Sequence, residues 1–418
     1  MHRRIPLDKN LSPRVLVIGV KSSKSENIDF DVLELASLCK TQNDDVVGTY
    51  FINNREIVAS TFISISKIEE IKRIAEKNSV DKLVFNVDLA RRQKNNIMKM
   101  TRLDVQDRHE VILNIFYEHA KTRIAKIEIE LARLKFEYSK LIGAYENLSR
   151  TGGGIGTRGP GEQKIEYRRR ELRQRIRILN TKLEEIKKNK KIQSKKRQKE
   201  FKCVLIGYTN SGKTSILRRL TDYHARIKDE LFATLDPVTK ILKFKNNDIC
   251  LVTDTIGFIR NIPPELINSF YETLSEIKDA DLKLHIVDIS SPYYMEQINT
   301  VNEVSKKLGF GQDSILVFNK IDLVYDENIL KRVLEKYPGA IFVSAKKNMN
   351  MDKIVDEIYT KYNKIFKEKR IPLDKCGEVV IKLQNKIHMN IVYENEVCII
   401  RYRKIYHSMI EETLNDID

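Results

Sequence analysis

The first hundred residues alternate short apolar runs with segments whose apolar residues recur every three or four positions. The apolar runs have the length and β-branched content of buried strands and cover residues 15–18, 46–52 and 82–85. Between them, residues 31–39 and 68–77 have helical spacing. Strands that alternate with helices form a largely parallel sheet, so the pattern predicts an α/β domain over residues 1–107. This domain contains no catalytic motif, and we expect it to have a structural or docking role.

A longer helical pattern follows from about residue 108. Apolar residues then recur at alternating spacings of three and four, at Ile124, Ile127, Leu131, Leu134, Tyr138, Leu141 and Tyr145. A similar spacing returns at Ile165, Leu172, Ile176, Leu179, Leu183 and Ile186. Each set forms a narrow apolar seam on one face of a long helix. Two such helices joined by a short connection predict an antiparallel hairpin, which we assign with its basic linker to residues 108–200.

The connection between the two seams is rich in glycine. Residues 152–161 contain six glycines and one proline, a composition that leaves the backbone mobile when free and lets its amides approach a partner. Arginines follow at once, and guanidinium groups match phosphate geometry. The candidate RNA-binding residues are Arg158, Lys164, Arg168, Arg169, Arg170 and Arg173. The alternative is a flexible tip beside a solvated basic helix.

Charge is concentrated in this part of the chain. The sequence has 75 Lys and Arg against 58 Asp and Glu, a formal net charge of +17. Residues 151–202 contain 18 basic and 6 acidic side chains, whereas residues 203–365 contain 22 of each. A localised excess indicates one element that faces a polyanion, attached to a nearly neutral remainder.

Several classes of protein are excluded by composition. No apolar stretch approaches the roughly eighteen residues that span a bilayer, and the first eight residues lack the apolar region of a secretory signal. The five cysteines are odd in number and form no C-x-x-C pair, so neither a disulfide framework nor a zinc site is expected. We therefore expect a cytoplasmic protein, with peripheral membrane association left open.

A phosphate-binding loop follows the apolar run at residues 203–206. The stretch from Gly207 to Thr214 matches G-x-x-x-x-G-K-[ST], directly after a strand as this motif requires. Its glycines let consecutive backbone amides wrap a phosphate at a helix N-terminus. Lys213 would bridge the β- and γ-phosphates, and Thr214 would place its hydroxyl on Mg²⁺.

Three further motifs follow in the order expected of a GTPase. Residues 249–257 end a strand in D-x-x-G, so Asp254 could hold Mg²⁺ through water and the Gly257 amide could sense the γ-phosphate. Residues 314–322 end a strand in N-K-x-D, where the carboxylate of Asp322 would accept two hydrogen bonds from guanine but not from adenine. Asn319 would brace the base and the phosphate loop, Lys320 would lie across the base plane, and the backbone of S-A-K at residues 344–346 would reach guanine O6.

The first switch should lie between the phosphate-binding loop and D-x-x-G, that is, between Thr214 and Asp254. Thr234 within F-A-T-L-D is its candidate Mg²⁺ ligand, with Thr239 a weaker one. Lys213, Thr234 and Gly257 are the candidate catalytic residues, and Mg²⁺ is the expected cofactor. The full GTP-binding set comprises Gly207, Tyr208, Thr209, Asn210, Ser211, Gly212, Lys213, Thr214, Phe232, Ala233, Thr234, Leu235, Asp236, Asp254, Thr255, Ile256, Gly257, Asn319, Lys320, Ile321, Asp322, Ser344, Ala345 and Lys346.

The residue after D-x-x-G bears on the rate of hydrolysis. Ras-like enzymes use a glutamine there to orient the attacking water, whereas this chain has Phe258. We therefore predict that the protein alone hydrolyses GTP slowly and that a partner activates it.

The predicted fold class is α/β: a Ras-like P-loop domain over residues 201–365, preceded by the small α/β domain and the hairpin. A short α+β domain over 366–418 follows, with strands expected around Val379 and Asn390.

Taken with these motifs, the chain resembles the HflX family of translational GTPases. The resemblance lies in the glycine-rich stretch at 152–176, in F-A-T-L-D and in D-T-I-G-F-I-R. It implies a monomeric cytoplasmic GTPase that binds the large ribosomal subunit, with the hairpin directed toward ribosomal RNA near the peptidyl-transferase centre, and that splits or rescues stalled ribosomes. Arg168 departs from the family pattern, which has an acidic residue there, and residues 62–67 lack a glycine-bearing stretch of the N-terminal domain. The alternatives are a signalling GTPase whose basic helix binds acidic membrane or a protein, and an NTP-dependent RNA-remodelling protein.

Overall fold

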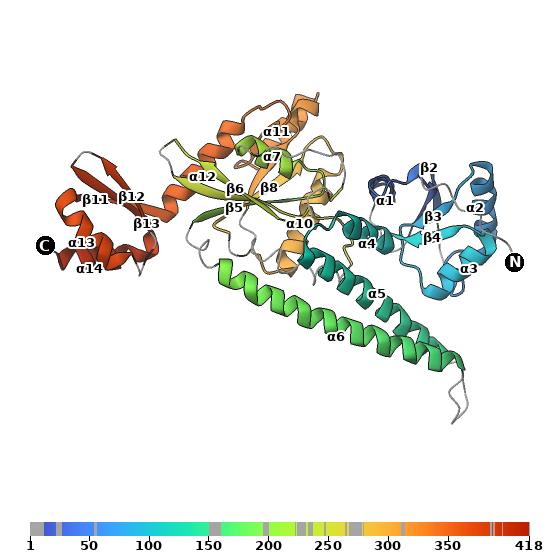
Figure 1. Cartoon of the computed structure of the whole chain (residues 1–418). Coiled ribbons are helices and arrows are strands. Elements are labelled where there is room, and N and C mark those ends of the chain that lie inside the picture. Colours follow the sequence, from blue (N-terminus) through green and yellow to red (C-terminus); the bar gives the residue numbers. More distant parts are fainter. Residues whose placement is uncertain are drawn as a thin grey trace.

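The computed structural model of the chain (Figure 1) describes most of its residues. These are residues 12–21, 27–53, 57–149, 160–194, 200–221, 223, 231–232, 237–245, 248–263, 266, 278, 280–310, 314–384, 387, 389–394 and 396–417.

The N-terminal domain is a four-stranded parallel sheet with helices on both faces. Its elements are β1 (Arg14–Lys21), α1 (Ile28–Thr41), β2 (Asp45–Asn53), α2 (Ile65–Lys77), β3 (Lys82–Phe85), α3 (Arg91–Thr101), β4 (Asp104–Asp107) and α4 (Arg108–His119). The strand order is β2-β1-β3-β4, and every neighbouring pair is parallel. The predicted parallel α/β fold is confirmed, although α4, which lies in the range predicted for the hairpin, packs on this sheet.

Successive side chains of β1 explain the two layers, since they point to opposite faces of the sheet. Val15 and Val17 pack with α1 and α4, whereas Leu16 and Ile18 pack with α2 and α3. All four side chains are buried, as in a parallel strand that is covered on both faces. The sheet therefore presents α1 and α4 together on one side, where the next domain lies (Figure 1).

Two long helices, α5 (Arg123–Ser149) and α6 (Pro160–Ser194), run side by side as the predicted antiparallel hairpin (Figure 1). The seams meet as expected: Ile127 and Leu131 pack against Leu179 and Leu183. In Figure 1, α5 starts beside α4 and runs away from the central domain.

The central domain is built on a six-stranded sheet. Its elements are β5 (Phe201–Gly207), α7 (Lys213–Leu220), β6 (Val238–Lys243), β7 (Ile249–Asp254), β8 (Leu282–Asp288), α10 (Tyr294–Lys307), β9 (Ile315–Asn319), η2 (Ile321–Leu323), α11 (Glu327–Lys336), β10 (Ile341–Phe342) and α12 (Met351–Ile365). The order is β10-β9-β8-β5-β7-β6, parallel except for β6, which runs antiparallel to β7. This is the mostly parallel P-loop sheet that the motifs predict.

The C-terminal domain lies at the opposite end of the molecule from the N-terminal domain (Figure 1). It contains β11 (Phe366–Pro372), α13 (Leu373–Leu383), β12 (Met389–Glu394), β13 (Val397–Arg403), η3 (Lys404–Tyr406) and α14 (His407–Asn415), with an antiparallel sheet in the order β11-β13-β12. The strand expected near Asn390 is β12. The strand expected at Val379 is wrong, because Cys376, Val379 and Leu383 form the buried stripe of helix α13.

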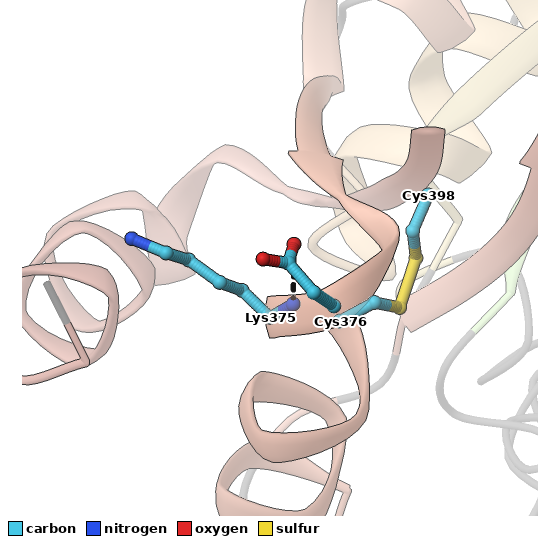
Figure 2. Close-up of a disulfide and its surroundings, with 4 residues drawn as sticks. Lys375, Cys376 and Cys398 are labelled. Carbon is cyan, nitrogen blue, oxygen red and sulfur yellow. Dashed lines mark hydrogen bonds between the residues drawn. A yellow bond between two sulfur atoms is a disulfide. The ribbon is translucent and has the colours of Figure 1, made fainter. Parts of the chain in front are cut away.

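The cysteines also depart from expectation, since two of the five are bonded. Cys376 of α13 and Cys398 of β13 form a disulfide in the buried core of the C-terminal domain (Figure 2). Cys39, Cys203 and Cys250 are free and buried. The pairing was not readable from spacing, because the partners are 22 residues apart and meet only when α13 packs onto the sheet.

Reduction of this disulfide should loosen the C-terminal domain. Closing a loop of 22 residues is worth about 3 kcal/mol through the entropy of the unfolded chain. Adding a reductant should therefore speed amide hydrogen exchange in residues 366–417 and leave the other domains unchanged. The Cys376→Ser/Cys398→Ser variant serves as control, because its exchange should not respond to the reductant. Alkylation of the unreduced protein in denaturant should label three cysteines, because the three free ones are buried in the fold, and labelling of all five would show that the bond is absent in solution.

Candidate nucleotide-binding site and its contacts with the N-terminal domain

Four of the predicted loops meet at one edge of the central sheet. The phosphate loop follows β5, D-x-x-G ends β7, N-K-x-D follows β9, and S-A-K follows β10. These strands are parallel, so their carboxyl ends lie at the same edge, where open α/β sheets bind ligands. Segments more than a hundred residues apart are thereby brought into contact.

The phosphate loop needs glycine at its last turn. Gly212 has φ of +93°, and a Cβ there would lie 2.1 Å from Nδ2 of Asn319. That amide nitrogen donates to the carbonyl of Ser211 at 2.9 Å, while Oδ1 of Asn319 accepts from the Ala345 amide at 3.0 Å. One buried side chain thus ties the phosphate loop to the S-A-K loop, in the bracing position expected for it.

Lys213 begins α7 with its ammonium group folded over the loop. Its Nζ donates to the carbonyl oxygens of Tyr208 at 2.8 Å and Gly207 at 3.3 Å. Burial lowers the pKa of Lys213 to about 8, and the negative charge of Asp254 opposes that shift. The site therefore holds a desolvated cation whose charge a polyphosphate would stabilise.

Asp254 and Thr214 form the oxygen-rich corner of the site. The hydroxyl of Thr214 donates to Oδ2 of the fully buried Asp254 at 2.6 Å. A hydroxyl beside a carboxylate is a hard oxygen donor set, which fits Mg²⁺. Among the described residues no group of three or more His, Cys, Asp or Glu gathers as a metal site.

The D-x-x-G segment is seated on the phosphate loop. The amide of Thr209 donates to the carbonyl of Phe258 at 2.8 Å, and the amide of Phe258 donates to the carbonyl of Gly207 at 3.0 Å. A Cβ at Gly257 would lie 2.7 Å from Cα of Thr209 and 3.1 Å from Nζ of Lys213. Glycine is required here for close approach of two backbones, and Thr255 and Ile256 beside it are buried.

The opposite end of the site contains the predicted base-recognition residues. Oδ1 of Asp322 accepts from the Ser344 hydroxyl at 2.6 Å, and Nζ of Lys320 lies 2.7 Å from a carboxylate oxygen of Asp288. Ile321 begins η2, and the carbonyl of Lys346 accepts from Arg219 at 3.1 Å. Asn210 adopts a left-handed φ of +59° within the phosphate loop, where Ser211 is buried.

The first switch is only partly described. Phe232 is buried against Phe116 of α4, with ring centroids 4.5 Å apart. The remaining candidates of that segment, Ala233, Thr234, Leu235 and Asp236, lie outside the described residues.

Residues from the N-terminal domain complete the surroundings of the phosphate loop, and sequence reasoning missed them. The hydroxyl of Tyr208 donates to Oε1 of Glu34 in α1, and Nη2 of Arg108, the first residue of α4, donates to Oε2 of the same carboxylate. All three side chains are buried. Arg108 lies 74 positions and Tyr208 lies 174 positions from Glu34 in the sequence, so no local motif could have indicated this group.

The same group holds the chain beyond D-x-x-G. The amide of Arg260 donates to the hydroxyl of Tyr208 at 3.1 Å, and Nη2 of Arg108 donates to the carbonyl of Arg260 at 3.1 Å. Burial, and then the charge of Glu34, raises the pKa of the Tyr208 phenol well above its ordinary value. The phenol therefore remains a hydrogen-bond donor at neutral pH. We call Glu34, Arg108, Tyr208 and Arg260 the interdomain cluster.

The candidate RNA-binding arginines of α6 are engaged within the hairpin. Arg168 donates to Glu137 of α5 and to Glu171, and Arg170 pairs with Glu166 at 2.8 Å. The guanidinium groups of Arg169 and Arg173 lie over the ring of Tyr138, 5.8 and 5.4 Å from its centroid. Arg158 and the side chain of Lys164 lie outside the described part of the chain. The departure at Arg168 thus adds a bond between the two helices.

Three family models match the chain in succession. They are described as GTP-binding GTPase N-terminal, GTP-binding GTPase Middle Region and 50S ribosome-binding GTPase, and they match residues 30–117, 119–197 and 202–320. No helix in the described ranges is long and apolar enough to cross a membrane.

Curated relatives share much of the length of the chain. GTPase HflX of Caldanaerobacter subterraneus subsp. tengcongensis is 36% identical, covering 87% of this chain and 85% of that protein. GTPase HflX of Escherichia coli K12 is 33% identical, covering 76% and 75%. Among solved structures, the complex of SsGBP with GDP aligns with a TM-score of 0.47 and 26% identity, covering 84% of this chain and 98% of that one.

Removing the acid of the interdomain cluster should destabilise the fold. Glu34→Ala would leave the Arg108 guanidinium buried without its partner, a change that costs about 3–5 kcal/mol. We expect a clearly lower melting temperature and faster hydrogen exchange in α1, α4 and residues 254–260. Glu69→Ala, which removes an exposed acid from α2, is the matched control and should stay within about 0.5 kcal/mol of wild type. Equal melting temperatures for both variants would contradict the assignment.

Proposed function

Because the chain belongs to the HflX family of GTPases, we propose that it binds the large ribosomal subunit in its GTP state and separates or rescues stalled ribosomes. Hydrolysis to GDP releases it. The observation that supports this most directly is the convergence of four nucleotide-binding loops at one sheet edge, within the stretch that matches the 50S ribosome-binding GTPase family.

The residues of the site suit the hydrolysis of GTP. Lys213 binds the β- and γ-phosphates, the amide of Gly257 senses the γ-phosphate, and Asp322 selects guanine. Thr214 and Thr234 of the first switch, with Asp254 through water, would hold Mg²⁺, which would neutralise charge on the phosphates. The left-handed turn at Gly212 and the close contact of the Gly257 backbone with Thr209 keep these groups close together.

Activation comes from the partner in this proposal. Phe258 is buried and paired through its backbone with the phosphate loop, so its side chain cannot orient a water molecule. Hydrolysis is therefore slow until the ribosome orders the switches or supplies a polar group. The hairpin contacts ribosomal RNA through residues of its glycine-rich connection and α6, namely Arg158, Lys164, Arg168, Arg169, Arg170 and Arg173.

The proposal predicts GTP hydrolysis that depends on the large subunit. Purified 50S particles should raise the turnover number at least about tenfold, and the protein should sediment with them in a non-hydrolysable GTP analogue but not in GDP. Lys213→Ala should abolish the stimulated turnover. Equal sedimentation in both nucleotides would refute the switch, and binding to anionic vesicles in place of 50S particles would favour a membrane-bound signalling GTPase.

The pKa of Lys213 predicts how nucleotide affinity depends on pH. The free protein holds this lysine with a pKa of about 8, and bound phosphates should raise that value. Below pH 8 the lysine is charged in both states and affinity should be flat. Above pH 8 binding must take up a proton, so the GDP affinity should fall about tenfold per pH unit. Calorimetry in buffers of different ionisation enthalpy measures the uptake, and Lys213→Met should abolish it.

A further inference from the structure

A cavity lies at the end of the hairpin where α5 begins. Its volume is about 460 Å³, within the range of small-ligand sites. The buried side chains of Ile127 and Leu179, from facing helices, form part of its lining. The walls belong to the first turns of α5, to the loop before it and to the middle of α6.

Five cations surround this cavity, and one acid accompanies them. The cations are Lys121, Arg123, Lys126, Arg175 and Lys182, all exposed. The acid, Glu130, pairs with Arg175 at 3.0 Å. Among the residues that the structure describes, the other four cations form no ion pair. In this they differ from Arg168 and Arg170, which form ion pairs with glutamates of the hairpin.

The start of α5 adds to the positive potential. Arg123 and Lys126 stand in or next to its first turn, which contains no acidic residue. A helix N-terminus already has a partial positive charge, so cations there destabilise the helix rather than stabilise it. An anion bound in the cavity would relieve that cost and the mutual repulsion of the lysines.

We propose that this cavity binds phosphate groups of RNA, as a contact separate from the arginines of α6 near its start. The cavity is concave and open to solvent, so a protruding phosphate group can enter it, whereas a flat bilayer would contact only the cations at its rim. Its apolar lining is buried and offers no exposed side chain for insertion into lipid. A phosphate group is complementary in charge to the cations that line the cavity. The inference rests on the proposed function only for the source of the RNA, which is ribosomal.

Three lysines test the cavity without touching the nucleotide site. The variant Lys121→Ala/Lys126→Ala/Lys182→Ala removes unpaired, exposed charges and should melt as wild type does. The matched control Lys77→Ala/Lys331→Ala/Lys353→Ala removes the same charge from exposed positions on α2, α11 and α12. Binding of the full chain to a fluorescein-labelled RNA hairpin is measured by anisotropy over a range of salt concentrations.

The cavity variant should lose affinity by about tenfold or more. The slope of its log affinity against log salt concentration should decrease in magnitude by about two to three. The control should keep the slope of wild type. A similar loss in both variants would show that only net charge matters, and no loss in the cavity variant would show that the cavity does not bind RNA. Either result overturns the proposal.

Other ligands are distinguished by further arms of the experiment. In the Lys213→Ala background, a fluorescent GTP whose residual binding depends on the three lysines would identify a free nucleotide as the ligand instead. Binding of polyglutamate or of phosphatidylserine vesicles that depends on the three lysines, without RNA binding, would identify an acidic peptide or a membrane. If the lysines govern RNA affinity but wild-type protein fails to sediment with 50S particles in GTP, the proposed function fails while the cavity assignment stands.

Discussion

The buried carboxylate of Glu34 is the interaction on which the arrangement of the first three parts of the chain depends. It accepts hydrogen bonds from Tyr208 of the phosphate loop and from Arg108 at the start of α4. Burial raises the pKa of Glu34, while the charge of Arg108 and the bond from Tyr208 oppose that rise. Tyr208 and Arg260 belong to the central domain, so separating the two domains would break the bonds of Tyr208 to Glu34 and of Arg108 to the Arg260 carbonyl and leave these buried groups without partners.

Apolar packing surrounds this cluster and makes the junction continuous. One hydrophobic core includes Phe30 and Phe116 of the N-terminal domain together with Tyr208, Phe232 and Phe258 of the central domain. The ring of Phe30 stacks on Tyr293 with centroids 4.6 Å apart. The residues flanking both switches are thus part of a core shared by two domains, and the N-terminal domain is built into the surroundings of the nucleotide site.

The features that could be predicted from the sequence are those that depend on residues close together in the chain. Contiguous motifs located the phosphate loop, D-x-x-G and N-K-x-D, because each is set by the backbone needs of a strand followed by a turn, as at Gly212. Apolar residues that recur at alternating spacings of three and four predicted the two helices of the hairpin. What could not be predicted depends on pairs distant in sequence, such as Glu34 with Tyr208, and Cys376 with Cys398. Val379 was misassigned because a short apolar run fits a strand or a helix equally well.

The chain connections link the interdomain cluster to the hairpin. Arg108 is the first residue of α4, and only residues 120–122 separate α4 from α5, so the hairpin is joined directly to the helix that holds Arg260. Arg260 lies three residues beyond Gly257, the residue expected to sense the γ-phosphate. A shift of the D-x-x-G segment must therefore either break the bonds of Arg260 to Arg108 and Tyr208 or move α4 with it. In the second case the hairpin moves too, because rigid helices transmit displacement along their length and α5 is 27 residues long.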